Sequence, residues 1–396
     1  MRILHTADWH LGRTLEGRSR LPEQEQFLEE LEVIVKDQNI DLVLMAGDVY
    51  DTVNPPASAE TLFYDSISRL ADGGRRQVVA IAGNHDNPER LAASSPLAAK
   101  QGITLLGMPG KELLTIDCRR TGERVQLYAL PYPSESRLKE LIMEEADEAK
   151  LQQAYSARIA GLIQEACAGF SQDAIRLIMS HVYVLGGQDS DSERPIQVGG
   201  AYTVHASAFG QMADYVALGH LHRPQAIKAD IPIRYSGSPL AYSFSEAGQA
   251  KSVTVLDVEP GSPPQVEEVW LSSGRPLVRW KAERGIAQVY EWLEQGRELQ
   301  AWIDLELHLE QALSMEDIQR LRKLHSGILN IRPIYASDDS RIEESETSWR
   351  NTPIDEVFRR FYQRQTGGAE PEPELVELFL RLLEESEEPA QSEVVG

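Results

Sequence analysis

Five short motifs combine aspartate, histidine and asparagine in a way that suits metal-dependent hydrolysis. In chain order they are Asp8-x-His10, Gly47-Asp48, Gly83-Asn84-His85-Asp86, a single His181, and Gly219-His220-x-His222. Carboxylate, imidazole and amide groups suit Mn, Fe or Zn, and the absence of cysteine from the motifs disfavours a structural thiolate zinc site. Two neighbouring dications would neutralise an anionic phosphate ester and lower the pKa of a water molecule between them.

Each motif taken alone is weak evidence. A D-x-H sequence occurs by chance, a Gly-Asp pair after a strand is more often a turn, and a lone histidine at a strand end is more often a hydrogen-bonded core residue. The set is more specific because order, spacing and position agree, and GNHD and GHLH are its most specific parts. The histidine inside the first apolar run, His5, is expected to be packed or hydrogen-bonded in the core.

Every motif directly follows an apolar run that is typical of a β-strand. The runs are 3–7, 41–46, 77–82, 175–180 and 214–218. Parallel strands of an open α/β sheet end at one edge, where such sheets place their sites. We therefore expect the five motifs to converge on one pocket.

The rest of the first two thirds of the chain alternates between strand and helix patterns. Further strands are expected at 103–107, 125–130, 233–236, 252–258 and 265–271, and helices at 22–38, 57–71 and 136–168. This pattern predicts an α/β domain over residues 1–271, with a central sheet covered by helices.

A smaller pattern follows the turn-rich stretch at 259–264. Residues 276–335 predict a β-α-β-α-β cap domain, and the polar run at 336–350 predicts a linker. Residues 351–396 predict two amphipathic helices and an acidic tail. The first helix gathers Ile354, Val357, Phe358, Phe361 and Tyr362 on one face, and the second gathers Leu375, Leu378, Phe379, Leu382 and Leu383.

The composition limits the function classes. The formal net charge is −23, with nine acidic residues in 370–396, which argues against a surface that grips nucleic acid all over. Arg13, Arg18 and Arg20 follow the first motif and either line a path for DNA or belong to a solvated loop. No GxxxxGK[ST] loop is present, so we do not expect this chain to hydrolyse ATP.

Targeting signals are not apparent in the sequence. The chain has two distant cysteines, no apolar run long enough to span a membrane, and an N-terminus that reads as a buried strand rather than a signal peptide. We therefore expect a cytoplasmic protein without membrane contact.

The order of the motifs resembles the calcineurin-like metallophosphoesterase superfamily and, within it, the double-strand-break repair nucleases. The stretches that carry the resemblance are HTADWHLG at 5–12, GDVYD at 47–51, AGNHD at 82–86, GHLHRPQ at 219–225 and YSGSPL at 235–240. The resemblance covers essentially the whole chain. It implies a metallophosphoesterase core of central β-sheets flanked by helices, a small α/β cap and C-terminal helices that bind a partner.

The resemblance also implies a site with two divalent ions, for which manganese is the expected metal. Asp8, His10, Asp48 and His222 would hold one ion, and Asp48, Asn84, His181 and His220 would hold the other. His85 would give a proton to the leaving oxygen, and Asp51 would orient its imidazole. Part of the family carries histidine near the position of Asp51. Asp86 is either a turn residue or a supporting partner.

The implied substrate is DNA, cut as a 3′→5′ exonuclease on duplex and as an endonuclease on single strands and hairpins. The implied partner is a coiled-coil ATPase bound through the C-terminal helices, with a homodimer of this chain inside a heterotetramer. One alternative is another enzyme on the same metal core, a phosphomonoesterase or cyclic-nucleotide phosphodiesterase, which would usually lack the cap and the helix pair. The other is a non-catalytic scaffold, which the seven filled ligand positions disfavour.

Overall fold

The computed structural model describes two compact units. The residues described are 1–138, 148–193, 202–309, 311, 313–335, 354–366, 371–373, 375–376 and 378–380. One unit is Met1–Arg279 with Gln300–Ile303, and the other is Trp280–Leu299 with Asp304–Gly396. The linker expected at 336–350 and the tail from 381 onward lie outside the described residues.

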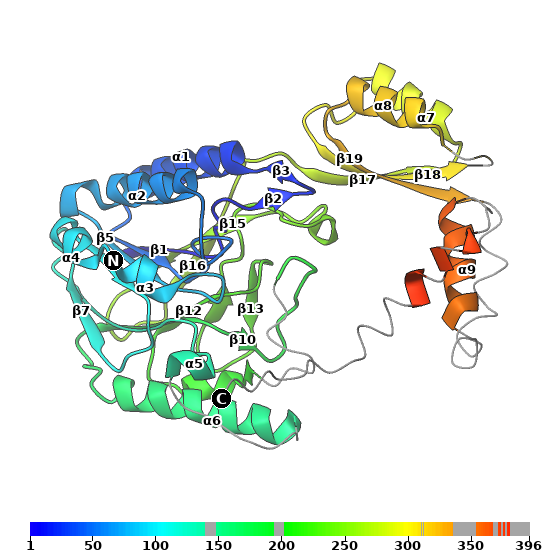
Figure 1. The fold of residues 1–396 in the computed structure, drawn as a ribbon. Coiled ribbons are helices and arrows are strands. Elements are labelled where there is room, and N and C mark those ends of the chain that lie inside the picture. Colours follow the sequence, from blue (N-terminus) through cyan, green and yellow to red (C-terminus); the bar gives the residue numbers. More distant parts are fainter. Residues whose placement is uncertain are drawn as a thin grey trace, which may run out of the picture. The chain divides into compact units, whose positions relative to one another are not determined.

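The first unit contains two six-stranded sheets (Figure 1). The first sheet has the order β16-β15-β1-β4-β5-β6, made of Gln265–Trp270, Ser252–Asp257, Arg2–Thr6, Leu42–Met45, Gln77–Ile81 and Ile103–Leu106. Strands β1, β4, β5 and β6 are parallel, and β15 pairs antiparallel with β1 on one side and with the edge strand β16 on the other. The central strands are buried on both faces, which explains why they appear in the sequence as continuous apolar runs.

The second sheet has the order β13-β14-β12-β9-β8-β7. Its strands are Gln225–Ile227, Ile233–Tyr235, Tyr215–Gly219, Ile175–His181, Arg124–Leu130 and Leu113–Asp117. Its four inner strands are parallel, and β13 and β7 are antiparallel edges. The sequence pattern does not separate the strands into two sheets, because strands of both sheets are similarly apolar. It also misses β7 and β13, whose half-exposed edge positions weaken the apolar signal.

Helices cover the outer face of each sheet, giving four layers. On the first sheet, α1 (Leu21–Asp37) and α2 (Ala57–Ala71) pack through a buried cluster that includes Phe27 and Phe63. On the second sheet, α6 (Glu148–Cys167) packs through Tyr155, Ile159 and Ile163. A third apolar cluster joins the inner faces of both sheets. The helix expected at 136–168 appears as α5 (Glu135–Leu138) and α6, with 139–147 outside the described part.

The second unit contains the β-α-β-α-β elements expected for a cap. They are β17 (Leu277–Ala282), α7 (Ile286–Glu294), β18 (Trp302–Leu309), α8 (Met315–Leu324) and β19 (Ile328–Tyr335). The strands form one sheet in the order β17-β18-β19. The division between the two compact units runs through β17, after Arg279, and through β18, after Ile303, so both strands have residues in each unit.

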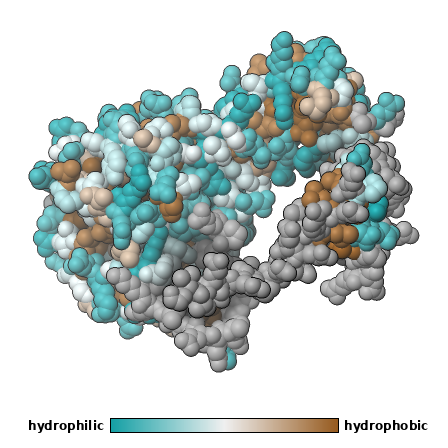
Figure 2. Space-filling view, in the orientation of Figure 1, coloured by the Kyte–Doolittle hydropathy of each residue, from teal (hydrophilic) through white to brown (hydrophobic). Residues whose placement is uncertain are grey.

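The C-terminal segment contains α9 (Ile354–Thr366), which matches the first amphipathic helix of the sequence pattern. Phe358 of this helix stacks on Phe379, with ring centroids 4.2 Å apart and an interplanar angle of 13°. Ile354 and Phe361 remain 52% and 56% exposed. Figure 2 shows hydrophobic surface on the described part of this segment. Of the second amphipathic pattern, Leu382 and Leu383 lie outside the described residues.

The cysteines and the hydropathy of the helices are as follows. Cys118 and Cys167 are both buried and carry free thiols. Within the part of the chain that the structure describes, every helix is too short or too polar to cross a membrane.

Candidate metal centre

The strand ends of both sheets bring the five motifs together. Asp8, Asp48 and Asn84 follow β1, β4 and β5 of the first sheet, while His181 ends β9 and His220 follows β12 of the second. The loop after β1 is tied to the loop after β4, because Asp8 N donates to the Gly47 carbonyl at 3.0 Å. The seven expected ligands therefore meet at one edge of the sandwich.

The first group of ligand atoms contains two facing imidazoles. The Nε2 atoms of His10 and His222 lie 3.0 Å apart, and His10 Nε2 lies 3.6 Å from Asp48 Oδ2. One donor atom each from Asp8, His10 and His222 fits within 4.8 Å. These are the four residues expected around the first ion.

The second group is built around the amide oxygen of Asn84. Asn84 Oδ1 lies 2.9 Å from His181 Nε2 and 3.2 Å from His220 Nδ1. His181 Nε2 is also 3.3 Å from Asp48 Oδ2. These are the four residues expected around the second ion.

One oxygen atom of Asp48 belongs to both groups. Its Oδ2 faces His10 and His181, whereas its Oδ1 accepts a hydrogen bond from the backbone N–H of His85 at 2.9 Å. A bridge between two ions would therefore use Oδ2. Asp8 also touches both groups, and its Oδ1 accepts the backbone N–H of His220 at 2.9 Å.

Glycines in three motifs make room for ligands from other motifs. A Cβ at Gly47 would lie 2.3 Å from His181 Nδ1, and a Cβ at Gly83 would lie 2.1 Å from Asp48 Oδ1. A Cβ at Gly219 would lie 1.9 Å from the carbonyl oxygen of Ala46. Because real Cβ atoms essentially never approach so closely, the glycines of GD, GNHD and GHLH are required by the packing of the ligands themselves.

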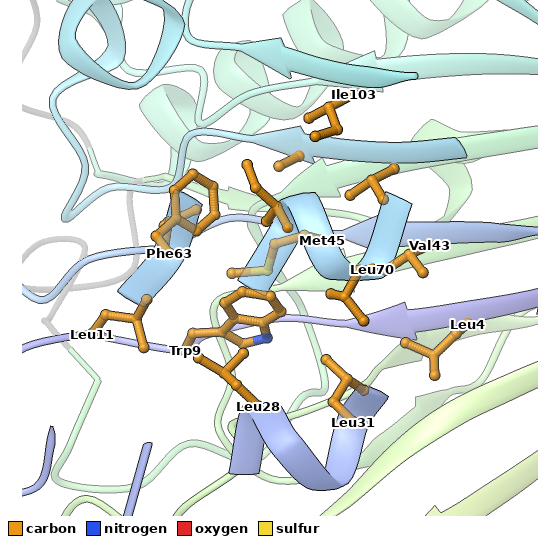
Figure 3. Packing of buried hydrophobic residues seen from close by; sticks show 14 of the residues in the cluster. Leu4, Trp9, Leu11, Leu28, Leu31, Val43, Met45, Phe63, Leu70 and Ile103 are labelled. Carbon is orange, nitrogen blue, oxygen red and sulfur yellow. The ribbon is translucent and has the colours of Figure 1, made fainter. Parts of the chain in front are cut away.

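The ligand loops adopt backbone conformations that are unusual for residues with side chains. Asp8, His10, Asp48 and His220 have φ of 56°, 45°, 52° and 109°. Such strain persists only where the surroundings hold it, and it concentrates at functional sites. Trp9 is one such anchor, since its buried ring lies among Leu28, Met45 and Phe63 (Figure 3).

The charges of the pocket fit divalent cations. Burial alone would lower the pKa of His181, but the carboxylates of Asp48 and Asp8 raise it to about 9. Its Nδ1 lies 2.9 Å from the Ala46 carbonyl, so Nε2 points at the oxygen atoms of Asp48 and Asn84. A proton on Nε2 thus occupies a place surrounded by oxygen ligands, where a metal ion would replace it.

The neutral form of His10 and His220 also suits metal binding. Burial lowers the pKa of His10 to about 3 and holds the pKa of His220 well below its ordinary value. Only neutral imidazole offers a lone pair to a metal. His10 Nδ1 is buried, has no hydrogen-bond partner among the residues described, and lies 3.5 Å from Asp51 Oδ1. If a metal takes Nε2, the proton of His10 moves to Nδ1, where it faces that carboxylate.

His85 and Asp51 meet in a different way from the one expected. His85 Nδ1 lies 2.7 Å from the main-chain carbonyl of Asp51, whereas the Asp51 carboxylate is 4.0 Å away and faces His10 and Arg13. A carbonyl only accepts, so His85 carries its proton on Nδ1. Its Nε2 is buried and meets no hydrogen-bond partner in the described part of the chain. The orienting group for His85 is therefore the backbone of Asp51.

Asp86 ties two ligand loops together. Its carboxylate accepts hydrogen bonds from the backbone N–H groups of Gly83, Val49 and Tyr50 at 2.8, 3.1 and 2.9 Å. It is a turn residue within GNHD and also a support for the loop that carries Asp48. Burial and the charge of Asp48 raise its pKa to about 6.

Of the three arginines considered for a DNA path, one is excluded by its burial. Arg20 is fully buried, where it forms an ion pair with Glu23 and donates to the Ala241 carbonyl. Arg18 is exposed, and Arg13 contacts Asp51 at 3.3 Å. Arg20 thus serves the fold, and a buried pair of this kind would be costly to break.

Several residues that support the ligands carry no motif in the sequence. Ser192 Oγ lies 2.5 Å from His222 Nδ1 and donates to Glu246 at 2.7 Å, and Lys251 pairs with Glu246. Gln24 donates to the His10 carbonyl at 2.8 Å. In the sequence these residues look like ordinary polar residues of loops and helices. Their contacts with the ligands become apparent only in the folded structure.

The fold and the candidate metal centre agree with the protein families that match this sequence. The calcineurin-like phosphoesterase family matches residues 1–224. A second family, described as the type 5 capsule protein repressor C-terminal domain, matches residues 273–366. A solved dimetal phosphatase from Danio rerio aligns with 69% of this chain and 99% of its own, at 14% identity and a TM-score of 0.39.

Two curated relatives define the family more closely. The chain is 54% identical over 389 residues to the SbcD subunit of the nuclease SbcCD of Bacillus subtilis, covering 98% of this chain and 99% of the relative. It is 36% identical over 296 residues to the protein of the same name from Rhodobacter capsulatus, covering 72% of each chain. The chain belongs to the SbcD nuclease family of calcineurin-like phosphoesterases.

Proposed function

We propose that this chain is the nuclease component of an SbcC–SbcD complex that processes DNA breaks. It cuts phosphodiester bonds with two divalent ions, preferably manganese, as a 3′→5′ exonuclease on duplex ends and as an endonuclease on hairpins and single strands. The relatives named above support the nuclease and the complex. The choice of manganese rests on the ligand types, and the cleavage modes rest on the resemblance set out in the sequence analysis.

The observation that carries the proposal is the position of Asp48 Oδ2. It lies 3.6 Å from His10 Nε2 and 3.3 Å from His181 Nε2, and each of these nitrogens belongs to a separate ligand group. A pair of ligand groups that share one carboxylate oxygen is what a two-metal hydrolase requires. When bound, the ions would neutralise the phosphate and lower the pKa of the attacking water.

The remaining residues of the pocket would bind, orient and move protons. His85 has Nδ1 fixed on the Asp51 carbonyl, so Nε2 is the atom that can exchange a proton with the leaving oxygen. Its ring lies edge-on to that of His10, with centroids 4.7 Å apart, so it stands beside the first ligand group without needing to join it. His85 is therefore the proposed general acid: as an imidazolium it would carry a second proton on Nε2 and give that proton to the leaving oxygen.

The partner proposal concerns the C-terminal segment. An SbcC-like coiled-coil ATPase would dock on α9 and the helical residues after it, where Ile354, Phe361 and Leu378 are 52%, 56% and 44% exposed. Such a partner would also add positive charge for DNA binding to a chain whose formal net charge is −23. A homodimer of this chain within a heterotetramer, and a cytoplasmic location, belong to the same proposal.

The test is a nuclease assay on a labelled duplex and a labelled hairpin, with Mn²⁺, with Mg²⁺ and with chelator. Asp48→Ala removes the shared ligand, and Asp65→Ala, an exposed aspartate on α2, is the matched control. We expect Mn²⁺-dependent cutting that is abolished by Asp48→Ala and unchanged by Asp65→Ala. Absence of DNA cleavage together with rapid hydrolysis of p-nitrophenyl phosphate would instead identify a phosphomonoesterase.

A further inference from the structure

Each imidazole of the first ligand group faces a polar side chain at the ring nitrogen that points away from the centre. His222 Nδ1 lies 2.5 Å from Ser192 Oγ, and His10 Nδ1 lies 3.5 Å from Asp51 Oδ1. The orientation of a metal-binding imidazole depends on the partner of its other nitrogen. Ser192 and Asp51 are therefore in position to aim the two Nε2 atoms.

Ser192 has a defined hydrogen-bond direction. Its hydroxyl donates to Glu246 Oε1 at 2.7 Å, because a carboxylate only accepts. It then accepts from His222 Nδ1, which leaves the lone pair of Nε2 pointing at the centre. Ser192 is 4% exposed and Glu246 1%, and Glu246 is itself fixed by Lys251 and by the backbone N–H of Tyr242 at 2.9 Å.

Arg13 connects this support to the one behind His10. Its guanidinium donates to the Ser192 carbonyl at 2.8 Å and contacts Asp51 Oδ1 at 3.3 Å. It also lies over the Tyr242 ring at 5.2 Å, and that ring packs edge-on against both His10 and His222. An unbroken series of contacts thus runs from Glu246 through Ser192, Arg13 and Asp51 to His10.

The second ligand group is supported differently. His181 Nδ1 lies 2.9 Å from the main-chain carbonyl of Ala46, which no side-chain substitution removes. The Asn84 oxygen lies between His181 and His220 and is not part of the Ser192 series. The histidines His222 and His181 of the two ion sites therefore have separate supports.

We propose that Ser192 and Arg13 are positioning residues that set the metal affinity of the first site, at His10 and His222, separately from that of the second. This inference rests on the proposed two-metal function and deepens it. The proposal also gives Arg13 a role within the protein, since its guanidinium contacts the Ser192 carbonyl and the Asp51 carboxylate.

The test measures Mn²⁺ binding to the metal-free full-length chain by titration calorimetry, with electron paramagnetic resonance to distinguish single from spin-coupled ions. We expect two bound Mn²⁺ in the unmodified chain. Ser192→Ala should weaken one of the two affinities roughly 10- to 100-fold and leave the other unchanged. At one equivalent of Mn²⁺ its spectrum should be that of a single, uncoupled ion.

Two further variants identify the site and guard against misfolding. The side chain of Arg13 is 17% exposed and acts on the imidazoles through Ser192 and Asp51. Arg13→Met should therefore weaken the same affinity by a smaller factor than Ser192→Ala. Arg13→Lys should bind Mn²⁺ more like the unmodified chain. In a His222→Ala background, Ser192→Ala should have no further effect. Ser66→Ala is the matched control and should bind both ions normally, because it removes a buried α2 hydroxyl that has no hydrogen-bond partner among the described residues.

The outcomes separate this inference from the proposed function. Two unchanged affinities in Ser192→Ala and Arg13→Met, or an equal loss at both sites, would overturn the positioning role while leaving the two-metal function intact. An unmodified chain that binds no Mn²⁺ would instead overturn the proposed function itself.

Discussion

The Nε2 atoms of His10 and His222 face each other at 3.0 Å, although the residues are 212 positions apart in the chain. Two neutral imidazoles in this arrangement satisfy each other only if one donates, whereas a cation between them satisfies both lone pairs. Metal should therefore stabilise the fold. At Mn²⁺ concentrations about 100-fold above Kd, each site adds about 2.7 kcal/mol to the free energy of unfolding.

This stabilisation can be measured as the change in Tm between chelator and Mn²⁺. We expect an increase of roughly 5 °C or more. Asp48→Ala, which lacks the shared ligand, should show almost none. Equal Tm values for the unmodified chain in chelator and in Mn²⁺ would contradict the assignment of this pocket as a metal centre.

His85→Gln should separate chemistry from metal binding. The side chain is not one of the seven ligands, and its buried Nε2 is the proposed proton donor. We expect turnover on a DNA duplex to fall by roughly 10²- to 10⁴-fold at saturating Mn²⁺, with both ions still bound. Metal content is the control, since a variant that loses an ion would show that His85 is a ligand.

The convergence of the seven residues at one edge could be predicted from the sequence because most of them have a local signal. Acidic, amide or imidazole side chains directly after an apolar run recur five times, and Gly47, Gly83 and Gly219 are required by contacts at the centre itself. The supporting residues have no such signal. Ser192 reaches His222 across 30 positions and Glu246 across 54, and nothing in the sequence indicates these distances in space.

Two other features depend on tertiary structure. The split into two sheets is not visible in the sequence, because the strands of both sheets are buried and apolar. The resemblance implies that Asp51 orients the imidazole of His85, and in the structure the group of Asp51 that contacts His85 is the main-chain carbonyl. A sequence shows which side chain is present, but not whether the side chain or the backbone makes the contact.

Gly83→Ala tests the packing of the ligand loops. The added Cβ would lie 2.1 Å from Asp48 Oδ1 and 2.3 Å from Asp48 N, so the Asp48 carboxylate must move. We expect the free energy of unfolding in chelator to fall by about 1–3 kcal/mol, with loss of at least one Mn²⁺. Gly110→Ala is the matched control, because a Cβ there meets no atom of the described residues within 4 Å. A Gly83→Ala chain with unchanged stability and two ions would refute the steric argument.

His5 should make the stability of the protein depend on pH. The residue is fully buried, with Nε2 3.0 Å from the Leu218 carbonyl and Nδ1 3.0 Å from the Tyr215 hydroxyl. Both ring nitrogens are satisfied in the neutral form, and burial lowers the pKa of His5 from 6.5 to about 3. Below pH 6.5 His5 therefore binds a proton in the unfolded chain but not in the folded chain, until the pH approaches 3.

The sign follows from this linkage. The contribution of His5 to stability is complete above pH 6.5 and is lost as the pH falls from 6.5 toward 3, by about 2 kcal/mol between pH 8 and pH 5. His5→Gln does not titrate, and its amide can still donate to Leu218. Urea unfolding in chelator at pH 8 and pH 5 should show a decrease that is about 2 kcal/mol smaller in the variant. Equal decreases in the two chains would mean that the folded protein accepts a proton at His5.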